Sequence, residues 1–219
     1  MALAHTPETS RTGANLQSTT AWTQEFAWAG QIPEFLREQP FSLEWQQPLF
    51  DEVGQALAQG QKIRPAIIGP LTYLWLGQVK EEGFDKLDLL ERLLPLYGEI
   101  LGRLAAEGVE WVQIDEPILT LDLPQAWKNA FERAYHILQY SPLQKLLSVT
   151  GGGLTDNLGV AVTLPVAGLH VDLEKAPHTL PAVLDRLPTY KVLSFGGPCD
   201  LALLQRAQER FADNLWLTA

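Results

Sequence analysis

Cysteine is almost absent from the sequence. Cys199 is the only one among 219 residues, so no disulfide can form within the chain and no thiolate cluster can hold a metal ion. The four histidines, at positions 5, 136, 170 and 178, lack the spacing of zinc ligands. We therefore expect a reducing, cytosolic setting and no metal site within this chain.

Positive charge and long apolar runs are also scarce. The sequence has 16 Lys and Arg against 26 Asp and Glu, a formal net charge of -10, which repels a phosphate backbone. The longest uncharged apolar stretch, residues 65–79, is shorter than the ~20 residues that span a bilayer. The beginning of the sequence lacks the apolar core of a signal peptide. We expect neither nucleic acid nor a membrane as a partner.

Hydrophobic residues make up 46% of the sequence, enough for one sizeable core. Residues 1–21, rich in Thr, Ser, Ala and Gln, have no apolar period and are expected to be a loose leader. Residues 22–219 are expected to form one unit. Strands are predicted within 62–74, 110–117, 145–152, 168–173, 191–197 and 215–219, with helices between them.

The helical segments carry start and stop signals. Segment 87–108 ends at Gly108 and should be kinked by Pro95, while Asp200 is a natural N-cap for 200–212. The apolar face of 87–108 is Leu87, Leu90, Leu94, Tyr97, Leu101 and Leu104. Alternating strands and helices predict an α/β fold with a parallel sheet, doubly wound or a barrel. We expect a (β/α) barrel of the TIM type, incomplete with about six of eight strands.

Alternate residues of a strand face opposite sides of the sheet, so the sequence predicts which side chains enter the barrel lumen. The inward set is Trp111, Gln113, Asp115, Ser148, Thr150, His170, Asp172, Ser194, Trp216 and Thr218. The outward set is Val112, Ile114, Leu147, Val149, Leu169, Val171, Leu173, Val192 and Leu217. Polar side chains near the carboxyl ends of several strands are typical of a ligand site at a barrel mouth.

We expect that site to be centred on Asp115, His170 and Asp172. Gln113 and Thr150 share the inward parity, and Thr72 belongs to a Gly-Pro turn, 69–72, at the end of the first strand. The remaining candidate is Glu116. It follows Asp115 directly, so in a regular strand its side chain points to the opposite face of the sheet. It either lines the mouth or caps a loop or helix start. The alternative for the whole group is a hydrogen-bond network that orders the lumen without any ligand.

Three segments carry a resemblance to a known family: IIGPLTYLWLGQVK, GVEWVQIDEPILTLDLPQAW and LPVAGLHVDL. In order and spacing they resemble the amino-terminal domain of cobalamin-independent methionine synthase, and the resemblance runs from residue 22 to the end. It implies two (β/α)₈ barrels that together transfer a methyl group from a methyl-folate polyglutamate to homocysteine. In that family a zinc ion, held by His, Cys, Glu and Cys of the carboxy-terminal barrel, activates the homocysteine thiol.

The resemblance carries no catalytic or zinc-binding position onto this sequence, because those positions belong to the second barrel. We therefore expect the chain to need a carboxy-terminal catalytic barrel as partner and to be inactive alone. Two departures bear on folate binding. Ala21 stands where the family has a lysine, and Trp28, Ala29 and Gly30 stand where it has Tyr-His-Tyr.

Two other functions remain open. One is a non-catalytic small-molecule-binding or assembly module derived from the same barrel. The other is an independent barrel enzyme in which Asp115, His170 and Asp172 transfer protons, since histidine titrates near neutral pH and neighbouring carboxylates raise its pKa.

Overall fold

The computed structural model describes residues 33–38, 40–43, 46–79 and 81–218. The expected leader, 1–21, and the departures at Ala21 and Trp28 to Gly30 lie outside the described residues. In chain order the elements are β1 (Glu34–Phe35), α2 (Gln47–Ala58), β2 (Ala66–Ile68), α3 (Pro70–Leu76), β3 (Gln78–Val79), η3 (Lys86–Leu89), α4 (Leu90–Ala106), β4 (Trp111–Asp115), η4 (Pro117–Thr120), α5 (Gln125–Leu138), β5 (Gln144–Val149), η5 (Thr155–Asn157), α6 (Leu158–Thr163), β6 (Gly168–Asp172), α7 (Thr179–Arg186), β7 (Val192–Gly196), α8 (Leu201–Phe211), η6 (Ala212–Asn214) and β8 (Leu215–Thr218).

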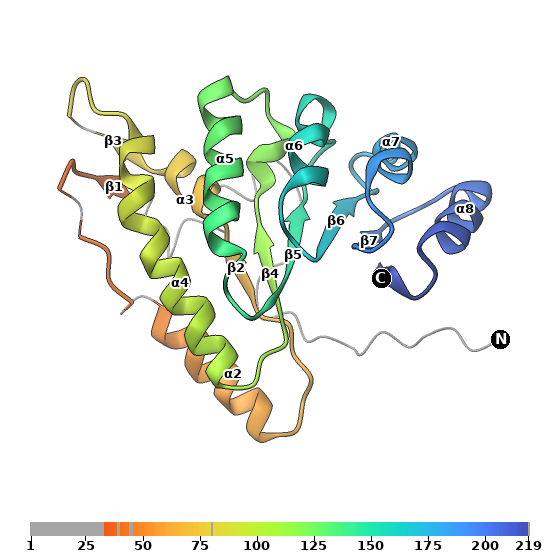
Figure 1. Cartoon of the computed structure of the whole chain (residues 1–219), viewed down its shortest axis with the longest axis horizontal. Helices are drawn as coiled ribbons and strands as arrows, with labels where there is room; N and C mark the ends of the chain where they lie inside the picture. Colours follow the sequence, from red (N-terminus) through yellow and green to blue (C-terminus); the bar gives the residue numbers. More distant parts are fainter. Residues whose placement is uncertain (1–32, 39, 44–45, 80, 219) are drawn as a thin grey trace.

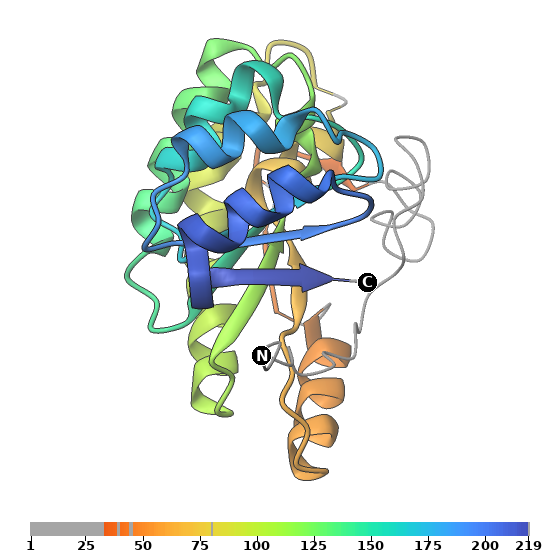
Figure 2. The ribbon, with the colours of Figure 1, turned by 90° about the vertical axis from the view of Figure 1, so that its right-hand side faces the viewer.

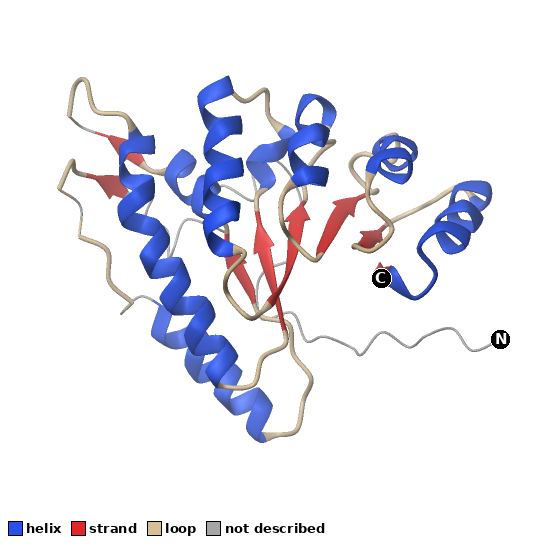
Figure 3. Ribbon diagram, in the orientation of Figure 1, coloured by secondary structure: helices blue, strands red, loops and turns tan. Residues whose placement is uncertain are grey.

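Six strands form one parallel sheet in the order β2-β4-β5-β6-β7-β8, and each overlaps a predicted segment. Every neighbouring pair is parallel, as strand-helix-strand connections require. Helices α5, α6, α7 and α8 follow one another over the outer face of this sheet (Figures 1 and 2), and Figure 3 shows the alternation of helix and strand. The prediction of an incomplete parallel (β/α) barrel is confirmed.

The sheet is strongly curled. Trp111 on β4 and Trp216 on β8 have ring centroids only 4.7 Å apart, although three strands lie between β4 and β8. In a flat sheet, four strand spacings would separate them by roughly 19 Å. In an eight-stranded barrel, strands four places apart are opposite each other, and their inward side chains meet in the lumen. The described strands therefore have the curvature of an eight-stranded barrel.

The main core lies between the outer face of the sheet and the helices. Ile114, Leu147, Leu169 and Leu193 are fully buried there, one from each of the four central strands. Because both faces of a parallel sheet are covered, apolar residues dominate the outward positions. The outward parity predicted from the sequence is thus confirmed for β4, β5 and β6.

Val192 is an exception, because it was expected to face outward and does not. It pairs with Gly168, and a Cβ added to that glycine would lie 2.9 Å from the Val192 Cβ. Val192 and Ser194 are two residues apart, so they share one face, and Leu193 takes the outward position. Val192 and Leu146 form the apolar part of the inner face below the polar residues.

Two local predictions from the sequence are confirmed: the apolar face of α4 and the N-cap of α8. Leu90, Leu94, Tyr97, Leu101 and Leu104 are buried as predicted, but α4 begins at Leu90, because Leu87 belongs to the 3₁₀ helix η3. The helix runs on through Pro95 and is followed by Gly108 at φ 95°. At α8, the Asp200 carboxylate accepts from the N–H groups of Ala202 and Leu203, as an N-cap does.

The predicted turn at 69–72 is wrong, because these residues open a helix. Gly69 is the N-cap of α3, and Pro70 takes the first helical position, where its missing N–H costs no bond. Local sequence suggests a turn because Gly-Pro is common in turns. A carboxylate from elsewhere in the chain caps this helix, as described below.

Candidate functional site

A polar row crosses the inner face of the sheet. Asp115, Ser148, His170 and Ser194 are successive register partners on β4, β5, β6 and β7, and all four are buried. Neighbouring strands are roughly 4.8 Å apart, so Asp115 and His170 lie about two strand spacings from each other. The structure therefore places both on the same face and at the same level, with Ser148 between them.

Hydrogen bonds connect much of this row. Gln113 Nε2 donates to Asp115 Oδ1 at 2.8 Å and approaches Ser148 Oγ at 3.4 Å. His170 Nδ1 lies 2.9 Å from Ser194 Oγ. A buried imidazole and a buried carboxylate held in this way can orient a polar ligand by hydrogen bonds, or order the lumen by themselves.

Thr150 lies one level higher, directly after the last residue of β5. It has the same parity as Ser148, and its side chain is buried. Within the part of the chain that the structure describes, its Oγ1 has no hydrogen-bond partner. Buried hydroxyls usually have a hydrogen-bond partner. The Thr150 hydroxyl is therefore a buried polar group on the inner side of the mouth that could bind a ligand.

Asp172 organises the loops above β6. Its Oδ2 accepts from the N–H of Gly151 at 3.2 Å, and its Oδ1 accepts from the N–H groups of Glu174 and Lys175. The carboxylate thus ties the loop after β5 to the loop after β6. Of the three residues expected at the centre, Asp115 and His170 share the polar row, whereas Asp172 contributes through loop geometry at the rim.

Glu116 and Thr72 form a separate, fully buried group behind the mouth. Glu116 Oε2 accepts from Thr72 N at 2.8 Å and Thr72 Oγ1 at 2.6 Å, while Oε1 accepts from Leu71 N at 3.3 Å and from the Tyr135 hydroxyl at 3.2 Å. The carboxylate therefore caps α3, the second role considered for it from the sequence. Both side chains support the mouth from behind the sheet, and a ligand would not reach them without displacing this network.

Burial controls the ionisation of that group. Desolvation raises the pKa of Glu116 from 4.5 to about 7, although the hydrogen bonds from Thr72, Leu71 and Tyr135 lower it in part. Desolvation, followed by the nearby Glu116 charge, raises the pKa of Tyr97 and Tyr135 well above the usual value. Sequence reasoning did not connect these tyrosines to Glu116. The available signal was weak, because tyrosines on apolar helix faces usually belong to the core.

No group of three or more His, Cys, Asp or Glu side chains that could hold a metal ion occurs among the described residues. Cys199 is half-buried. Burial raises the pKa of its thiol, and the negative charge of the neighbouring Asp200 raises it further. A thiol with a raised pKa is a poor metal ligand. The zinc of the resembled family therefore does not fit the side chains described.

No described helix is both long and apolar enough to cross a bilayer.

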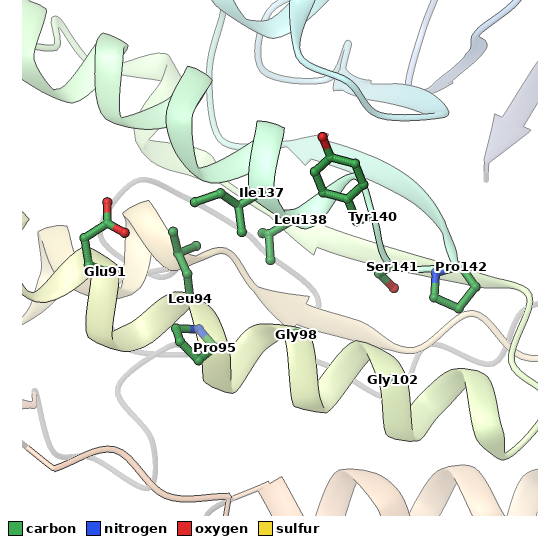
Figure 4. A pocket seen from close by; sticks show the side chains of 10 residues that line it. All are labelled: Glu91, Leu94, Pro95, Gly98, Gly102, Ile137, Leu138, Tyr140, Ser141 and Pro142. Atoms are coloured by element: carbon green, nitrogen blue, oxygen red, sulfur yellow. The ribbon is translucent and has the colours of Figure 1, made fainter.

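An open groove of about 490 Å³ lies elsewhere, in the outer helical layer (Figure 4). On one side α4 contributes Glu91, Leu94, Pro95, Gly98 and Gly102, and on the other the end of α5 and the turn after it contribute Ile137, Leu138, Tyr140, Ser141 and Pro142. None of these residues belongs to the polar row. The groove therefore lies apart from the candidate site.

The fold and the inner polar row define a class: a parallel (β/α) barrel of the TIM type with polar side chains at the carboxyl ends of its strands. Residues 31–197 match the model of the cobalamin-independent synthase family, N-terminal domain, which is more than half of the chain. The chain therefore belongs to the cobalamin-independent methionine synthase family and corresponds to its amino-terminal domain.

Solved structures agree with this fold. A protein described as a vitamin-B12-independent methionine synthase from Listeria monocytogenes is similar at a TM-score of 0.60 and 16% identity, over 78% of this chain and 61% of that chain. A methyltransferase from Methanosarcina mazei has a TM-score of 0.57 and 14% identity, over 85% and 63%. A B12-independent methionine synthase from Shewanella sp. W3-18-1 has a TM-score of 0.53 and 16% identity, over 82% and 60%. The chain thus spans about three-fifths of the length of these proteins.

Proposed function

We propose that the chain serves as the amino-terminal barrel portion of a methyltransferase. That enzyme moves a methyl group from 5-methyltetrahydrofolate polyglutamate to homocysteine in methionine biosynthesis. The observation that carries the proposal is the family match over residues 31–197. The six-stranded curled sheet supports it, because the sheet is the framework of such a barrel.

In this proposal the chain contributes binding and support, and a carboxy-terminal barrel contributes the chemistry. Zinc, held by that second barrel, would supply a deprotonated homocysteine thiol near neutral pH. Because the resemblance places the zinc ligands in that second barrel, we expect the chain to be inactive alone. A reducing, cytosolic setting completes the proposal, since a free thiol persists there.

Candidate ligand contacts are the polar groups that face the lumen. Gln113, Asp115, His170 and Thr150 come from three different strands, and their positions follow from the strand register. Asp172 shapes the loop above them through Gly151. Glu116 and Thr72 act from behind by fixing α3.

The first test is calorimetric titration of the folded full chain with methyl-tetrahydrofolate triglutamate, homocysteine and Zn²⁺, each separately. We expect weak or no heat of binding from all three, because the candidate contacts form only part of a site that a carboxy-terminal barrel completes, and because Ala21 stands where the family has a lysine. A methyl-transfer assay then combines the chain with the carboxy-terminal barrel of a family member. Transfer above the level of that barrel alone would support the proposal, and no increase at saturating chain concentration would contradict it.

A second candidate function is a non-catalytic small-molecule-binding or assembly module derived from this barrel. The unpartnered, buried Thr150 hydroxyl favours it, because it offers a hydrogen bond that no described residue uses. Tight folate binding without any gain of methyl transfer in the combined assay would favour this module over the transferase role.

A further inference from the structure

The short helix α3 depends at its beginning on a side chain from another element. It has seven residues, fewer than an isolated helix needs to be stable in water. Its N-cap, Gly69, has no side chain that could cap it. The Glu116 carboxylate, which directly follows β4, accepts instead from the N–H groups of Leu71 at 3.3 Å and Thr72 at 2.8 Å. The beginning of α3 therefore keeps its cap only while Glu116 stays in place.

The end of α3 is held in a similar way. The Lys86 ammonium donates to the carbonyl oxygens of Trp75 at 2.6 Å and Gly77 at 3.1 Å. It also lies 5.8 Å and 5.9 Å from the ring centroids of Trp75 and Trp127. A negative charge at the beginning of a helix and a positive charge at its end both favour the helix dipole. Two titratable side chains from outside α3 thus hold it between α4 and α5 (Figure 1).

The backbone after α3 has few ties to the rest of the chain. There β3 pairs with β1, and each of these strands has two residues. In contrast, β6 pairs with β5 on one side and with β7 on the other. Segments with few backbone ties open at a lower free energy than central strands do. We therefore expect α3 to open more readily than β6.

The titratable groups around Glu116 carry no positive charge. Burial, followed by the Glu116 charge, raises the pKa of Tyr97 on α4 and of Tyr135 on α5. Tyr73 of α3 adds to the effect on Tyr97, and Asp115 of β4 adds to the effect on Tyr135. Burial raises the pKa of Glu116 itself to about 7, and no Lys or Arg among the described residues contributes to that pKa. A buried carboxylate without a cation gains hydration when its surroundings open.

We propose that α3 is a pH-sensitive segment behind the mouth, which opens locally when Glu116 releases its proton and packs again when Glu116 is protonated. Opening brings the carboxylate into water and separates it from Leu71 and Thr72. Because Glu116 directly follows Asp115, the opening also loosens the backbone beside a candidate ligand contact. This inference depends on the packing of α3 and not on methyl transfer, so it can fail while the proposed function holds.

Proton linkage gives the direction of the effect. The pKa of Glu116 is about 7 with α3 packed, against 4.5 for a carboxyl group in water. Between these values the packed state binds more protons than the open state, so the packed state loses its advantage as the pH rises through 7. From pH 6 to pH 8 the ratio of packed to open α3 should fall about tenfold.

The test is amide hydrogen exchange of the full chain at pH 6 and pH 8. Protection is the exchange rate of an unstructured peptide at the same pH divided by the observed rate. We expect the amides of Leu71, Thr72 and Tyr73 to be at least tenfold less protected than those of β6, and to lose about tenfold of their protection from pH 6 to pH 8. Equal protection of α3 and β6 would overturn the proposal, because α3 would then open only with the whole chain. Protection of α3 that is the same at both pH values would overturn it as well.

Two substitutions separate the ends of α3. Glu116→Gln removes the titration, so α3 protection should change less than twofold between pH 6 and pH 8. Lys86→Met weakens the other end, so α3 protection should fall at both pH values while the tenfold difference between them remains. A tenfold difference that persists in Glu116→Gln, or that disappears in Lys86→Met, would contradict the assignment to Glu116. The native and Lys86→Met chains test the proposal even if Glu116→Gln does not fold.

Discussion

Trp111 and Trp216 contact each other from strands on opposite sides of the curl, and their positions in the register explain why. Trp216 is level with Asp115 when register partners are followed from β8 back to β4. Trp111 precedes Asp115 by four residues. In a TIM-type barrel a shear of about 8 residues over the whole circuit displaces the register by about one residue per strand. The contact between Trp111 and Trp216 is therefore the one expected from both the curvature and the shear of a TIM-type barrel.

The tryptophan pair should stabilise the curl. Replacing either Trp111 or Trp216 with alanine should lower the free energy of unfolding by about 2 kcal/mol, less than for fully buried aromatic residues because both are partly exposed. The double variant should lose about 1 kcal/mol less than the sum of the two, because edge-to-face rings interact directly. Urea unfolding measures both values.

The control for this cycle is Tyr190→Ala, because Tyr190 is 78% exposed and should change the free energy by no more than about 0.5 kcal/mol. Strict additivity of the two tryptophan substitutions would show that the rings do not stabilise the curl through their contact.

Much of the fold follows from the sequence because the strands are short and regularly patterned. Asp115, His170 and Ser194 could be placed on one face by alternation alone, and the structure confirms this. The prediction for Val192 is wrong because its apolar side chain suggests an outward position, although it lies two residues from the inward-facing Ser194. One level below this row, Leu146 and Val192 face inward together with the polar Gln113, so polarity does not decide the face there.

The support behind the mouth could not be predicted in the same way. Thr72 and Glu116 are 44 residues apart in sequence, and their bond forms only because β2 and β4 are neighbours. Strand pairing of this kind is not visible in local patterns, so the helix at Pro70 resembled a turn. Ser148 could be placed by parity, but its position between Asp115 and His170 required the register.

Glu116 predicts a pH dependence of stability. Its folded pKa is about 7 against 4.5 for an exposed carboxyl, so between these values the folded state binds more protons than the unfolded state. The contribution of this group is therefore fully present below pH 4.5 and is lost as the pH rises to 7. The loss is about 3 kcal/mol.

Glu116→Gln isolates this effect, because glutamine retains an acceptor for the N–H groups of Leu71 and Thr72 but does not titrate. Urea unfolding at pH 5 and pH 7.5 should show the native chain losing more stability than the variant over that interval. If both lose the same amount, the ionisation of Glu116 does not affect folding.

Gly69 should be intolerant of any side chain. A Cβ at this position would lie 2.1 Å from the Glu116 carboxyl carbon, which is held by four hydrogen bonds and cannot easily move. Gly69→Ala should therefore lower the free energy of unfolding by about 2 kcal/mol or more. Thermal unfolding measures the change.

Gly54 gives a matched comparison. It lies inside α2, and a Cβ there would meet no atom within 4 Å. Gly54→Ala should raise the free energy of unfolding by about 0.5 to 1 kcal/mol, because alanine restricts the unfolded chain and favours the helix. A destabilising Gly54→Ala would indicate contacts with residues outside the described set.

Lys191 should stabilise the end of α6 through its ammonium group. The Nζ donates to the carbonyl oxygens of Val162 at 2.9 Å and Leu164 at 2.6 Å, and the residue is buried. Lys191→Ala would leave both carbonyls without this donor and open a cavity, so the free energy of unfolding should fall by about 2 to 4 kcal/mol. Lys62→Ala, at an exposed position, should have little effect.

Titration gives an independent check on Lys191. Desolvation lowers its pKa from 10.5 to about 8 in the folded chain, so between pH 8 and 10.5 the unfolded state binds more protons. This group therefore makes the folded state relatively more stable as the pH rises through that window. Lys191→Met removes the titration and keeps most of the volume. Unfolding at pH 7.5 and pH 9.5 should show a smaller upward trend for the variant, and an identical trend would mean that Lys191 has an ordinary pKa.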